Sequence, residues 1–493
     1  MQKLQPRPVL DPKACYVAMS THDSRFDGRF FVGVSSTGIY CRPVCRVKLP
    51  KFENCSFFSN AAAAEASGYR PCMKCRPELA PGKAPIDSAS RLAEKAVLII
   101  EENSRDELKL AEVAEILNIT DRHLRRIFFN EFGVTPVQYL QTKKMLLAKS
   151  LLTDTKISMA DVAMAAGFNS IRRFNDLFLK QYGMPPGKLK KRIGREDQDE
   201  ISVSLAYRPP YAWDNLLSFL GHRAVPGVEF IYDGMYRRTV AMEKSGKIFR
   251  GWVAVKNQKK SNTLSVTVST GLLPVLAKVL ARIRFLFDLN CDPVEVFEHL
   301  YHSDTVIRNL LVSGIRLPGS FDPFEISVRA VFGQQISVKA AQTIAGRFVQ
   351  LYGQEIKTPF PELSFTFPLP EIVCAAGTEI ETRLGNAGVT SARSRTVLAL
   401  AEAVKSGNLN LSLSSDPATE TKKLLDIPGI GQWTAQYIAM RALGWPDVFL
   451  STDHGIRKFF PGMSQAAIEQ LSEFWQPWRS YATINLWNSL SGE

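Results

Sequence analysis

The stretch CRPVCRVKLPKFENCSFFSNAAAAEASGYRPCMKC (residues 41–75) contains two pairs of closely spaced cysteines. Cys41 and Cys45 form a C-x3-C pair. Cys72 and Cys75 form a C-x2-C pair, and 26 residues lie between the pairs. This is the spacing of two turns that close on one tetrahedral zinc ion. Four unrelated buried thiols are the alternative, but both pairs lie in basic turns next to prolines and not in apolar runs. The sequence therefore predicts one Zn²⁺ bound by these four sulfurs.

The composition of the whole chain indicates how many domains to expect and where its positive charge lies. The chain has 493 residues, of which 45% are hydrophobic and 22% charged, so several globular domains are expected. The net charge is +13, and residues 1–200 contribute +9 of it, from 32 basic and 23 acidic side chains. Residues 1–200 are therefore better suited to bind a polyanion than the rest of the chain.

The N-terminus favours an intracellular protein. MQKLQPRPVL (1–10) lacks the apolar segment of a signal peptide, and no apolar run reaches 18 residues. A cytoplasmic, nucleoid-associated location with reduced cysteines is expected, and a membrane partner is not. Four thiolates on one zinc ion stay deprotonated and hence nucleophilic. Spacing alone does not separate a reactive site from a structural one.

The sequence around the cysteines resembles a known family. GRFFVGVSSTGIYCRPVCR (28–46) and ENCSFFSNAAAAEASGYRPCMKCRPE (53–78) closely resemble the N-terminal domain of the bacterial Ada family. The resemblance implies that Cys41 irreversibly accepts a methyl group from a methylphosphotriester in DNA. Methylation would remove one negative charge and strengthen DNA binding. Arg42 and Arg70 are candidate phosphate contacts, with ordinary solvated arginines as the alternative.

An internal repeat follows the cysteine domain. LKLAEVAEILNITDRHLRRIFFNEFGVTP (108–136) matches ISMADVAMAAGFNSIRRFNDLFLKQYGMPP (157–186). Each copy predicts two helices joined by a short turn, and basic residues such as Arg125 and Arg172 on the second helix suit a DNA major groove. The pair resembles the AraC-type double helix-turn-helix domain. Two amphipathic hairpins with solvated faces are the alternative. The Pro-rich stretch 77–88 and the charged stretch 186–200 are expected to be linkers.

The back half contains a second signal, LLDIPGIGQWTAQYIAMRAL (424–443). Gly429 and Gly431 allow a tight turn between two helices, whose backbone N–H groups can bind a DNA phosphate. Asp453 follows Gly431 by 22 residues. A helix-hairpin-helix followed at this distance by an acid is similar to the pattern of base-excision DNA glycosylases.

Several separate stretches resemble AlkA, the family of bacterial 3-methyladenine DNA glycosylases. They are residues 207–229, 269–293, 315–348 and 474–487, within a total resemblance of about 201–490. The resemblance implies that Asp453 stabilises the sugar cation formed during base release, although a helix-capping aspartate is the alternative. It implies a pocket that binds the everted base by stacking. The pocket residues carried over are Trp433, Tyr437, Trp487 and Phe219, with core packing as the alternative for each.

The sequence departs from the AlkA pattern at three positions. Thr452 replaces a second Asp, and His454 replaces a Tyr. Gln334 and Gln335 match the loop that pushes a wedge into the duplex, but Gln335 replaces a Leu. Trp433 stands where strand-nicking relatives carry a Schiff-base Lys, so a glycosylase without lyase activity is expected.

These observations predict a multidomain chain that is mainly α-helical with small α+β domains. The expected order is a four-cysteine zinc domain (1–83), a double helix-turn-helix domain (88–190), a small α+β domain (201–287) and an all-α helix-hairpin-helix glycosylase domain (288–493). Strands are expected at VAMEK (240–244), IFRGWVAV (248–255) and TLSVTVS (263–269). The expected function is DNA alkylation repair by base excision and methyl acceptance, coupled to transcriptional activation, by a monomer that binds double-stranded DNA. The alternative is a non-enzymatic AraC-type regulator with a degenerate glycosylase-like module.

Overall fold

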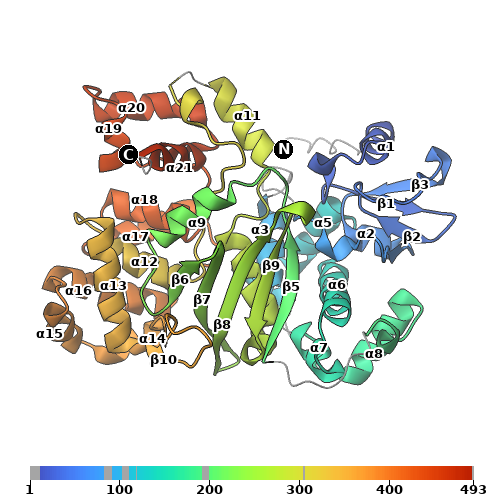
Figure 1. Ribbon diagram of the computed structural model, residues 1–493, viewed down its shortest axis with the longest axis horizontal. Helices are drawn as coiled ribbons and strands as arrows, with labels where there is room; N and C mark the ends of the chain where they lie inside the picture. The colour runs from blue at the N-terminus through green and yellow to red at the C-terminus, as the bar shows by residue number, and fades with distance from the viewer. Residues whose placement is uncertain are drawn as a thin grey trace. The chain divides into compact units, whose positions relative to one another are not determined.

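The computed structural model describes residues 11–82, 91–102, 110–117, 119–190, 199–303 and 306–490 (Figure 1). The expected linkers at 77–88 and 186–200 lie partly outside these residues, as does the N-terminal stretch 1–10. The chain divides into two compact units. Unit 1 comprises Met1–Pro209, Gln258–Ala281 and Leu289–Cys291, and unit 2 comprises Pro210–Asn257, Arg282–Asp288 and Asp292–Glu493.

Unit 1 contains the cysteine pairs and the repeat. Its helices are α1 (Pro12–Ser20), α2 (Ala61–Ala66), α3 (Arg91–Glu102), α4 (Leu110–Ile116), α5 (Asp121–Phe132), α6 (Pro136–Asp154), α7 (Met159–Ala165) and α8 (Ile171–Tyr182). Its strands are β1 (Phe31–Val34), β2 (Ile39–Cys41), β3 (Cys55–Phe58), β4 (Arg70–Pro71), β5 (Glu200–Ala206) and β9 (Thr263–Ser269). Short 3-10 turns include η3 (Pro77–Leu79) and η5 (Pro186–Lys188).

The N-terminal part of unit 1 contains a four-stranded sheet of order β3-β1-β2-β4. β1 pairs antiparallel with β2 and β3, while β2 and β4 are parallel with Tyr40 opposite Pro71. β2 ends at Cys41, and Cys72 directly follows β4. The register of β2 and β4 therefore brings Cys41 and Cys72 side by side. The fully buried rings of Phe30 and Tyr40 form part of the supporting core.

The two sequence repeats fold as two helix-turn-helix copies, as predicted. α4 and α5 form the first copy, and α7 and α8 form the second. Thr120 and Ser170 cap the N-termini of α5 and α8 through their hydroxyl groups. Gly133 and Gly183 end these helices with φ angles of +70° and +68°, a conformation that favours glycine. The 19-residue helix α6 follows the first copy and leads into the second.

The expected strand TLSVTVS is β9, which pairs antiparallel with β5. Leu264, Val266 and Val268 are fully buried, in agreement with the period-two pattern. VAMEK and IFRGWVAV lie in β7 and β8 of unit 2, so all three expected strands are confirmed.

Unit 2 combines an antiparallel ribbon with a large helical part. Its strands are β6 (Glu229–Tyr232), β7 (Met235–Lys244), β8 (Lys247–Gln258), β10 (Gln354–Glu355) and β11 (Phe365–Thr366), and β7 pairs with both β6 and β8. Its helices are α9 (Trp213–Gly221), α11 (Pro293–Ser303), α12 (Pro323–Phe332), α13 (Val338–Tyr352), α14 (Pro370–Ala376), α15 (Glu379–Asn386), α16 (Ser391–Lys405), α17 (Pro417–Leu425), α18 (Gln432–Arg441), α19 (His454–Lys458), α20 (Gln465–Ser472) and α21 (Arg479–Leu490). The division between the units falls within α10 (Leu276–Leu286).

Residues 323–352 form two helices with a break between them. α12 ends at Phe332, and Ser337 caps the start of α13 through its hydroxyl. The break contains Gln334 and Gln335, and Gln335 is exposed with a φ of +53°. α17 and α18 flank the PGIG turn, as the helix-hairpin-helix pattern predicts. Within the described residues, every helix is too short or insufficiently apolar to cross a bilayer.

Candidate functional site

The two cysteine pairs converge in unit 1. The sulfur atoms of Cys41, Cys45, Cys72 and Cys75 all lie within 4.8 Å of one another. Tetrahedral zinc with four sulfur ligands requires sulfur atoms about 3.8 Å apart, as follows from a Zn–S bond of ~2.3 Å. Three of the thiols are buried and Cys75 is half-buried. The donor set therefore fits zinc in both chemistry and spacing.

Arg42 and Arg70, the predicted phosphate contacts, lie in different surroundings. The Arg42 guanidinium is 14% exposed, forms an ion pair with Asp27 and donates to the Cys75 carbonyl at 3.1 Å. The Arg42 backbone N–H donates to Cys75 Sγ at 3.4 Å. These contacts brace the cysteine turns. Arg70 is exposed and lies beside Gly183 at the end of α8.

The second helix of each repeat presents basic side chains to solvent. Arg125 is exposed and forms an ion pair with Asp121 one turn earlier, at 3.0 Å. Arg172 occupies the first turn of α8 and is exposed. Leu124 and Phe174 are fully buried on the opposite faces. Both helices are thus amphipathic, with a basic outer face that can enter a DNA groove.

In unit 2, the Asp453 carboxylate is held between two indole rings. Its Oδ2 accepts a hydrogen bond from Trp433 Nε1 at 3.0 Å, and its Oδ1 accepts one from Trp487 Nε1 at 3.0 Å. Oδ1 also accepts from the backbone N–H of Ile456 at 3.1 Å, which makes Asp453 the N-cap of α19. The helix-capping alternative is therefore correct as a description of the fold, but it does not account for the two indole donors. Neutral donors orient the carboxylate without neutralising its charge.

The two indole rings each stack on a further aromatic ring, and we call the four rings the aromatic cluster: Phe219, Trp433, Tyr437 and Trp487. Trp433 stacks on Tyr437 with ring centroids 5.2 Å apart, and Phe219 stacks on Trp487 at 6.2 Å. Tyr437 and Trp487 are 6.3 Å apart, which links the two pairs. Phe219 is buried, whereas the other three rings are half-buried and keep part of their surface accessible. The structure thus brings together every predicted pocket residue.

Two arginines that the sequence analysis missed contact the aromatic cluster. The Arg223 guanidinium lies 3.8 Å from the Phe219 ring centroid, and Arg441 Nη1 donates to the Tyr437 hydroxyl at 2.8 Å. Burial lowers the pKa of Arg223 to about 10. Burial alone would raise the pKa of Tyr437, but nearby guanidinium groups, Arg441 first, hold it below its ordinary value. A signal was present for Arg441, which follows Tyr437 by four residues on α18 and so shares its helical face, whereas Arg223 lies beyond the end of α9.

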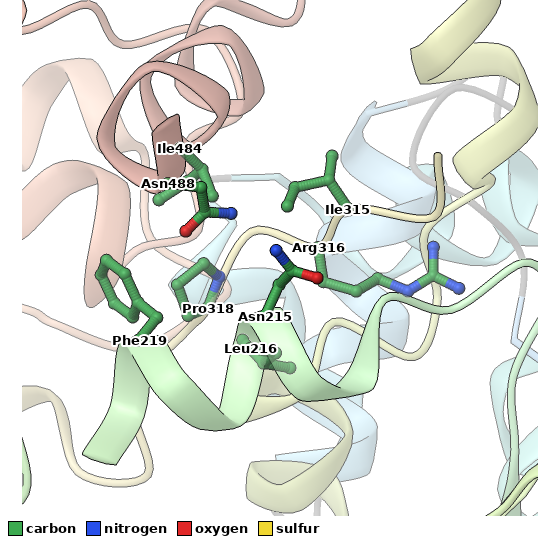
Figure 2. A pocket seen from close by; sticks show the side chains of 8 residues that line it. All are labelled: Asn215, Leu216, Phe219, Ile315, Arg316, Pro318, Ile484 and Asn488. Carbon is green, nitrogen blue, oxygen red and sulfur yellow. The ribbon is translucent and has the colours of Figure 1, made fainter. Parts of the chain in front are cut away.

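Phe219 of the aromatic cluster also lines a small pocket (Figure 2). Its lining residues are Asn215, Leu216, Phe219, Ile315, Arg316, Pro318, Ile484 and Asn488. Phe219 therefore belongs both to the aromatic cluster and to this pocket.

The predicted DNA-contacting turns lie next to each other. Gln334 Nε2 donates to the Gly429 carbonyl at 2.8 Å and to Thr434 Oγ1 at 3.0 Å. These hydrogen bonds connect the segment between α12 and α13 to the hairpin between α17 and α18. Gln335, in the same segment as Gln334, is exposed. Gly429 has a φ of +89°, whereas Gly431 is exposed and starts α18 at a φ of −91°. The break and the hairpin therefore form one continuous surface.

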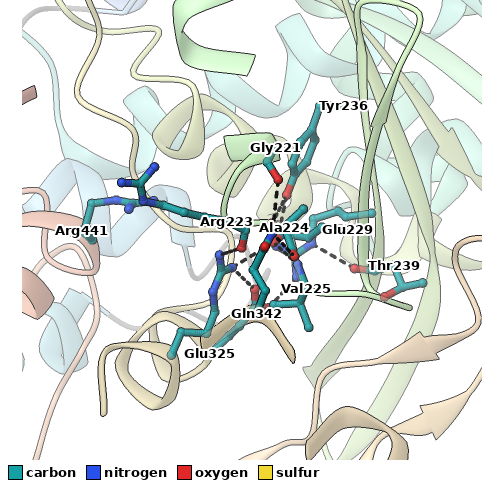
Figure 3. A network of polar contacts seen from close by, with 12 residues as sticks. Gly221, Arg223, Ala224, Val225, Glu229, Tyr236, Thr239, Glu325, Gln342 and Arg441 are labelled. Atoms are coloured by element: carbon teal, nitrogen blue, oxygen red, sulfur yellow. Dashed lines mark hydrogen bonds and ion pairs between the residues drawn. The ribbon is translucent and has the colours of Figure 1, made fainter. Parts of the chain in front are cut away.

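A buried ionic network supports the loop that carries Arg223 (Figure 3). Arg238 and Arg329 both pair with Glu229 and Glu325, at distances from 2.6 to 3.5 Å. Arg329 also donates to the Arg223 carbonyl. Two positive and two negative charges balance in this network, which reduces the cost of burying them.

Three family models match the chain. They are the metal binding domain of Ada over residues 14–78, a helix-turn-helix domain over residues 113–192, and the AlkA N-terminal domain over residues 202–322. The first of these and the four converging sulfurs together identify a site for one Zn²⁺.

Curated relatives match the whole chain as well as its parts. The probable bifunctional transcriptional activator/DNA repair enzyme AlkA of Mycobacterium tuberculosis (strain H37Rv) is 35% identical over 492 residues, which is 97% of this chain and 97% of that protein. DNA-3-methyladenine glycosylase 2 of Escherichia coli K12 is 38% identical over 58% of this chain and 96% of its own length. The bifunctional transcriptional activator/DNA repair enzyme AdaA of Bacillus subtilis is 30% identical over 36% of this chain and 83% of its own length.

Proposed function

Because this chain belongs to the family of bifunctional transcriptional activators and DNA repair enzymes AlkA, we propose that it excises alkylated bases from DNA and accepts methyl groups from the DNA backbone. The substrate proposed for excision is a 3-methyladenine type of lesion. The observation that carries this proposal is the Asp453 carboxylate, which two indole N–H groups hold inside the aromatic cluster.

The site supports hydrolysis of an N-glycosidic bond. An everted base would stack on the half-buried rings of the aromatic cluster, and a base that carries positive charge gains a further cation–π attraction. As the bond to the base breaks, positive charge builds on the sugar. The Asp453 carboxylate stabilises that charge, and water completes the reaction at the anomeric carbon. Trp433 has no amine to form a Schiff base, so we propose a glycosylase that leaves the strand intact.

The direct test is an assay for abasic sites. Wild-type protein incubated with alkylated duplex DNA should release bases and leave abasic sites. Asp453→Asn keeps the helix cap but removes the negative charge, and release should fall by at least about 100-fold. Asp416→Asn changes the cap of α17 in the same way and should keep wild-type activity. Full activity in Asp453→Asn would refute the assignment, and no release by the wild type would leave only a DNA-binding role.

The cysteine cluster supports the methyl-acceptor activity. Cys41, Cys45, Cys72 and Cys75 would hold Zn²⁺, which keeps their sulfurs deprotonated at neutral pH. The Cys41 sulfur forms a bond to the methyl carbon of a methylphosphotriester, and the bond from carbon to the phosphate oxygen breaks. The products are a thioether and an anionic phosphodiester, so no other reactant is needed.

Mass spectrometry tests this assignment. After exposure to DNA that carries methylphosphotriesters, the peptide with Cys41 should gain the mass of one methylene group. Cys41→Ser should gain nothing, whereas Cys55→Ser, outside the cluster, should react as the wild type does. A methyl group on Cys45, or on no cysteine of the wild type, would refute the role of Cys41.

The remaining surfaces support binding to double-stranded DNA. Arg125 and Arg172 lie on the exposed faces of the second helices, where a major groove would be read. Gly429, Gly431, Gln334 and Gln335 form the surface beside the aromatic cluster, which suits phosphate binding and a wedge. Arg70 is exposed and remains a candidate phosphate contact, whereas the Arg42 guanidinium is occupied by Asp27 and Cys75.

We propose that a monomer carries these activities on four consecutive domains, at 1–83, 88–190, 201–287 and 288–493. The duplicated helix-turn-helix supports a monomer, because two copies in one chain supply the two reading helices that a dimer otherwise provides. Methylation of Cys41 would remove one negative charge near DNA and thereby activate transcription of the repair genes.

A further inference from the structure

One short helix of the zinc domain contacts both second helices of the helix-turn-helix copies. α2 begins at its N-cap Asn60, whose Nδ2 donates to the Phe132 carbonyl at the last residue of α5, at 2.7 Å. Near its other end, Glu65 Oε2 accepts a hydrogen bond from Gln181 Nε2 in the last turn of α8, at 2.8 Å. α2 therefore touches the C-terminal ends of α5 and α8.

Glu65 is also bonded to the strand that ends at the methyl-acceptor cysteine. Its Oε1 accepts a hydrogen bond from the Tyr40 hydroxyl at 3.0 Å, and Tyr40 immediately precedes Cys41 on β2. A third donor is Thr142 Oγ1 of α6, at 2.8 Å from Oε2. Side chains from β2, α6 and α8 thus meet on one carboxyl group.

This arrangement is more than ordinary packing. Glu65 is 8% exposed, and a buried carboxyl group costs free energy unless its oxygens receive hydrogen bonds. Within the part of the chain that the structure describes, the hydrogen bonds to Glu65 come from neutral donors on three separate segments. Removing the carboxyl group would therefore leave three partners unsatisfied and release three elements together.

Ion pairs between the same two domains support this junction. Lys149 of α6 pairs with Glu78 at 2.6 Å, and both side chains are 2% exposed. Arg76 pairs with Asp154 at the end of α6, also at 2.6 Å. Arg70 of β4 lies against Gly183, which ends α8. The zinc domain is thus bound to the repeat over several points and not through one flexible link.

We infer that Glu65 is a positioning residue that fixes the strand of the methyl acceptor to α8 while Asn60, at the other end of α2, fixes α5, so that the zinc domain sets how α5 and α8 present their basic faces to DNA. The inference rests on the proposed roles of Cys41 and of the helix-turn-helix copies. It predicts that a loss at Glu65 reaches α8, where its partner Gln181 lies 116 residues further along the chain.

Hydrogen exchange of the zinc-loaded full chain tests this. The amides in the last turn of α8 (179–183) should exchange about tenfold faster in Glu65→Ala, because one lost hydrogen bond of ~1.4 kcal/mol corresponds to that factor, whereas the last turn of α5 (129–133) keeps its hydrogen bond from Asn60. Glu65→Gln keeps an oxygen acceptor and should restore slow exchange. Glu53→Ala, an exposed glutamate of the same domain, should change neither helix end.

Single-partner variants separate the two arms of the junction. Asn60→Ala should speed exchange at the end of α5 alone, and Gln181→Ala should do so at the end of α8 alone. If Glu65→Ala does not fold, these two variants still test the inference. Unchanged exchange in both would overturn the inference, as would a rise confined to α2.

DNA binding gives the functional readout. The probe is a duplex enriched from a random-sequence pool by the wild-type protein. Affinity should fall about tenfold in Glu65→Ala and return in Glu65→Gln, with zinc content unchanged in both. Equal affinity of wild type and Glu65→Ala would overturn the positioning role. Methyl transfer to Cys41 is measured in the same preparations, so failure of the acceptor activity would be seen in the wild type, independently of the exchange result.

Discussion

At the scale of single residues, Asp453 shows how neutral donors can prepare a charged group for chemistry. The two indole N–H groups fix both carboxylate oxygens, and the same indole rings offer faces to a base. Orientation and stacking therefore depend on the same two side chains, Trp433 and Trp487. Conservative variants can separate the two contributions.

Trp433→Phe should keep the stacking surface but lose the hydrogen bond to Asp453 Oδ2. We expect the rate of base release to fall about tenfold, because a lost hydrogen bond to a charged group costs roughly 1.5 kcal/mol or more. Trp433→Ala loses the ring as well and should fall further. Single-turnover assays of base release on alkylated duplex DNA measure both. Equal rates for Trp433→Phe and wild type would show that the indole N–H does not contribute.

Glu65 should make the stability of unit 1 depend on pH. Burial raises the pKa of Glu65 to about 7, against the opposing effect of its hydrogen-bond donors and of Lys149. Tyr40, Tyr182 and Glu78 are the other titratable groups nearby. A raised pKa means that the fold favours the protonated acid, so its stabilisation is complete below the ordinary pKa of ~4.5 and is lost as pH rises to about 7.

The matched variant for this pH effect is Glu65→Gln, which stays neutral at every pH. The free energy of unfolding of wild type, relative to that of Glu65→Gln, should decrease by about 3 kcal/mol between pH 4.5 and pH 7 and stay level above it. Urea unfolding at a series of pH values measures the difference. A difference that does not vary with pH would contradict the raised pKa.

At the scale of elements, the hairpin between α17 and α18 depends on one of its two glycines. A Cβ on Gly429 would lie 2.1 Å from Thr396 Oγ1, and its φ of +89° disfavours any other residue. Gly429→Ala should therefore lower stability by about 2–3 kcal/mol and weaken DNA binding. Gly431 has open space around its Cβ position and an ordinary φ, so Gly431→Ala should leave stability unchanged. Thermal unfolding compares the two, and equal melting temperatures would refute this account.

The sequence predicted the elements whose signals are local and missed contacts made between distant segments. The two helix-turn-helix copies and the hairpin follow from apolar spacing and glycine positions within about 30 residues, and the structure has them where they were predicted. Arg42 was expected to contact phosphate, but its pairing partner Asp27 lies 15 residues earlier on a different turn. Glu65 gave no signal because its three donors come from segments that only the folded chain brings together.

At the scale of the whole molecule, buried charges hold distant segments of each unit in register. In unit 2, Arg329 of α12 pairs with Glu229 of β6 and with Glu325 one turn earlier. It also holds the loop with Arg223 against the aromatic cluster. Both the stability of the unit and the shape of the base-binding site should therefore depend on this residue.

Arg329→Met should lower the free energy of unfolding by about 3–5 kcal/mol, because it leaves the buried carboxylates of Glu229 and Glu325 to share one arginine, Arg238. Base release should decline in the protein that remains folded. Arg383→Met breaks an exposed pair with Glu379 and should cost less than about 1 kcal/mol. Denaturant titration of both variants measures the costs. Similar small losses in both would show that the buried network is not a main support.

Asp453 both caps α19 and carries the proposed catalytic charge, and this restricts which substitutions the protein can tolerate at this position during evolution. Most replacements at this position would loosen the start of α19 and be removed because the chain folds poorly. Asparagine, serine and threonine would each keep the start of that helix nearly unchanged while abolishing the charge, and of these three only asparagine is reached by a single-nucleotide change. Descendants of this gene that have given up base excision but still regulate transcription should therefore carry asparagine here more often than any other residue.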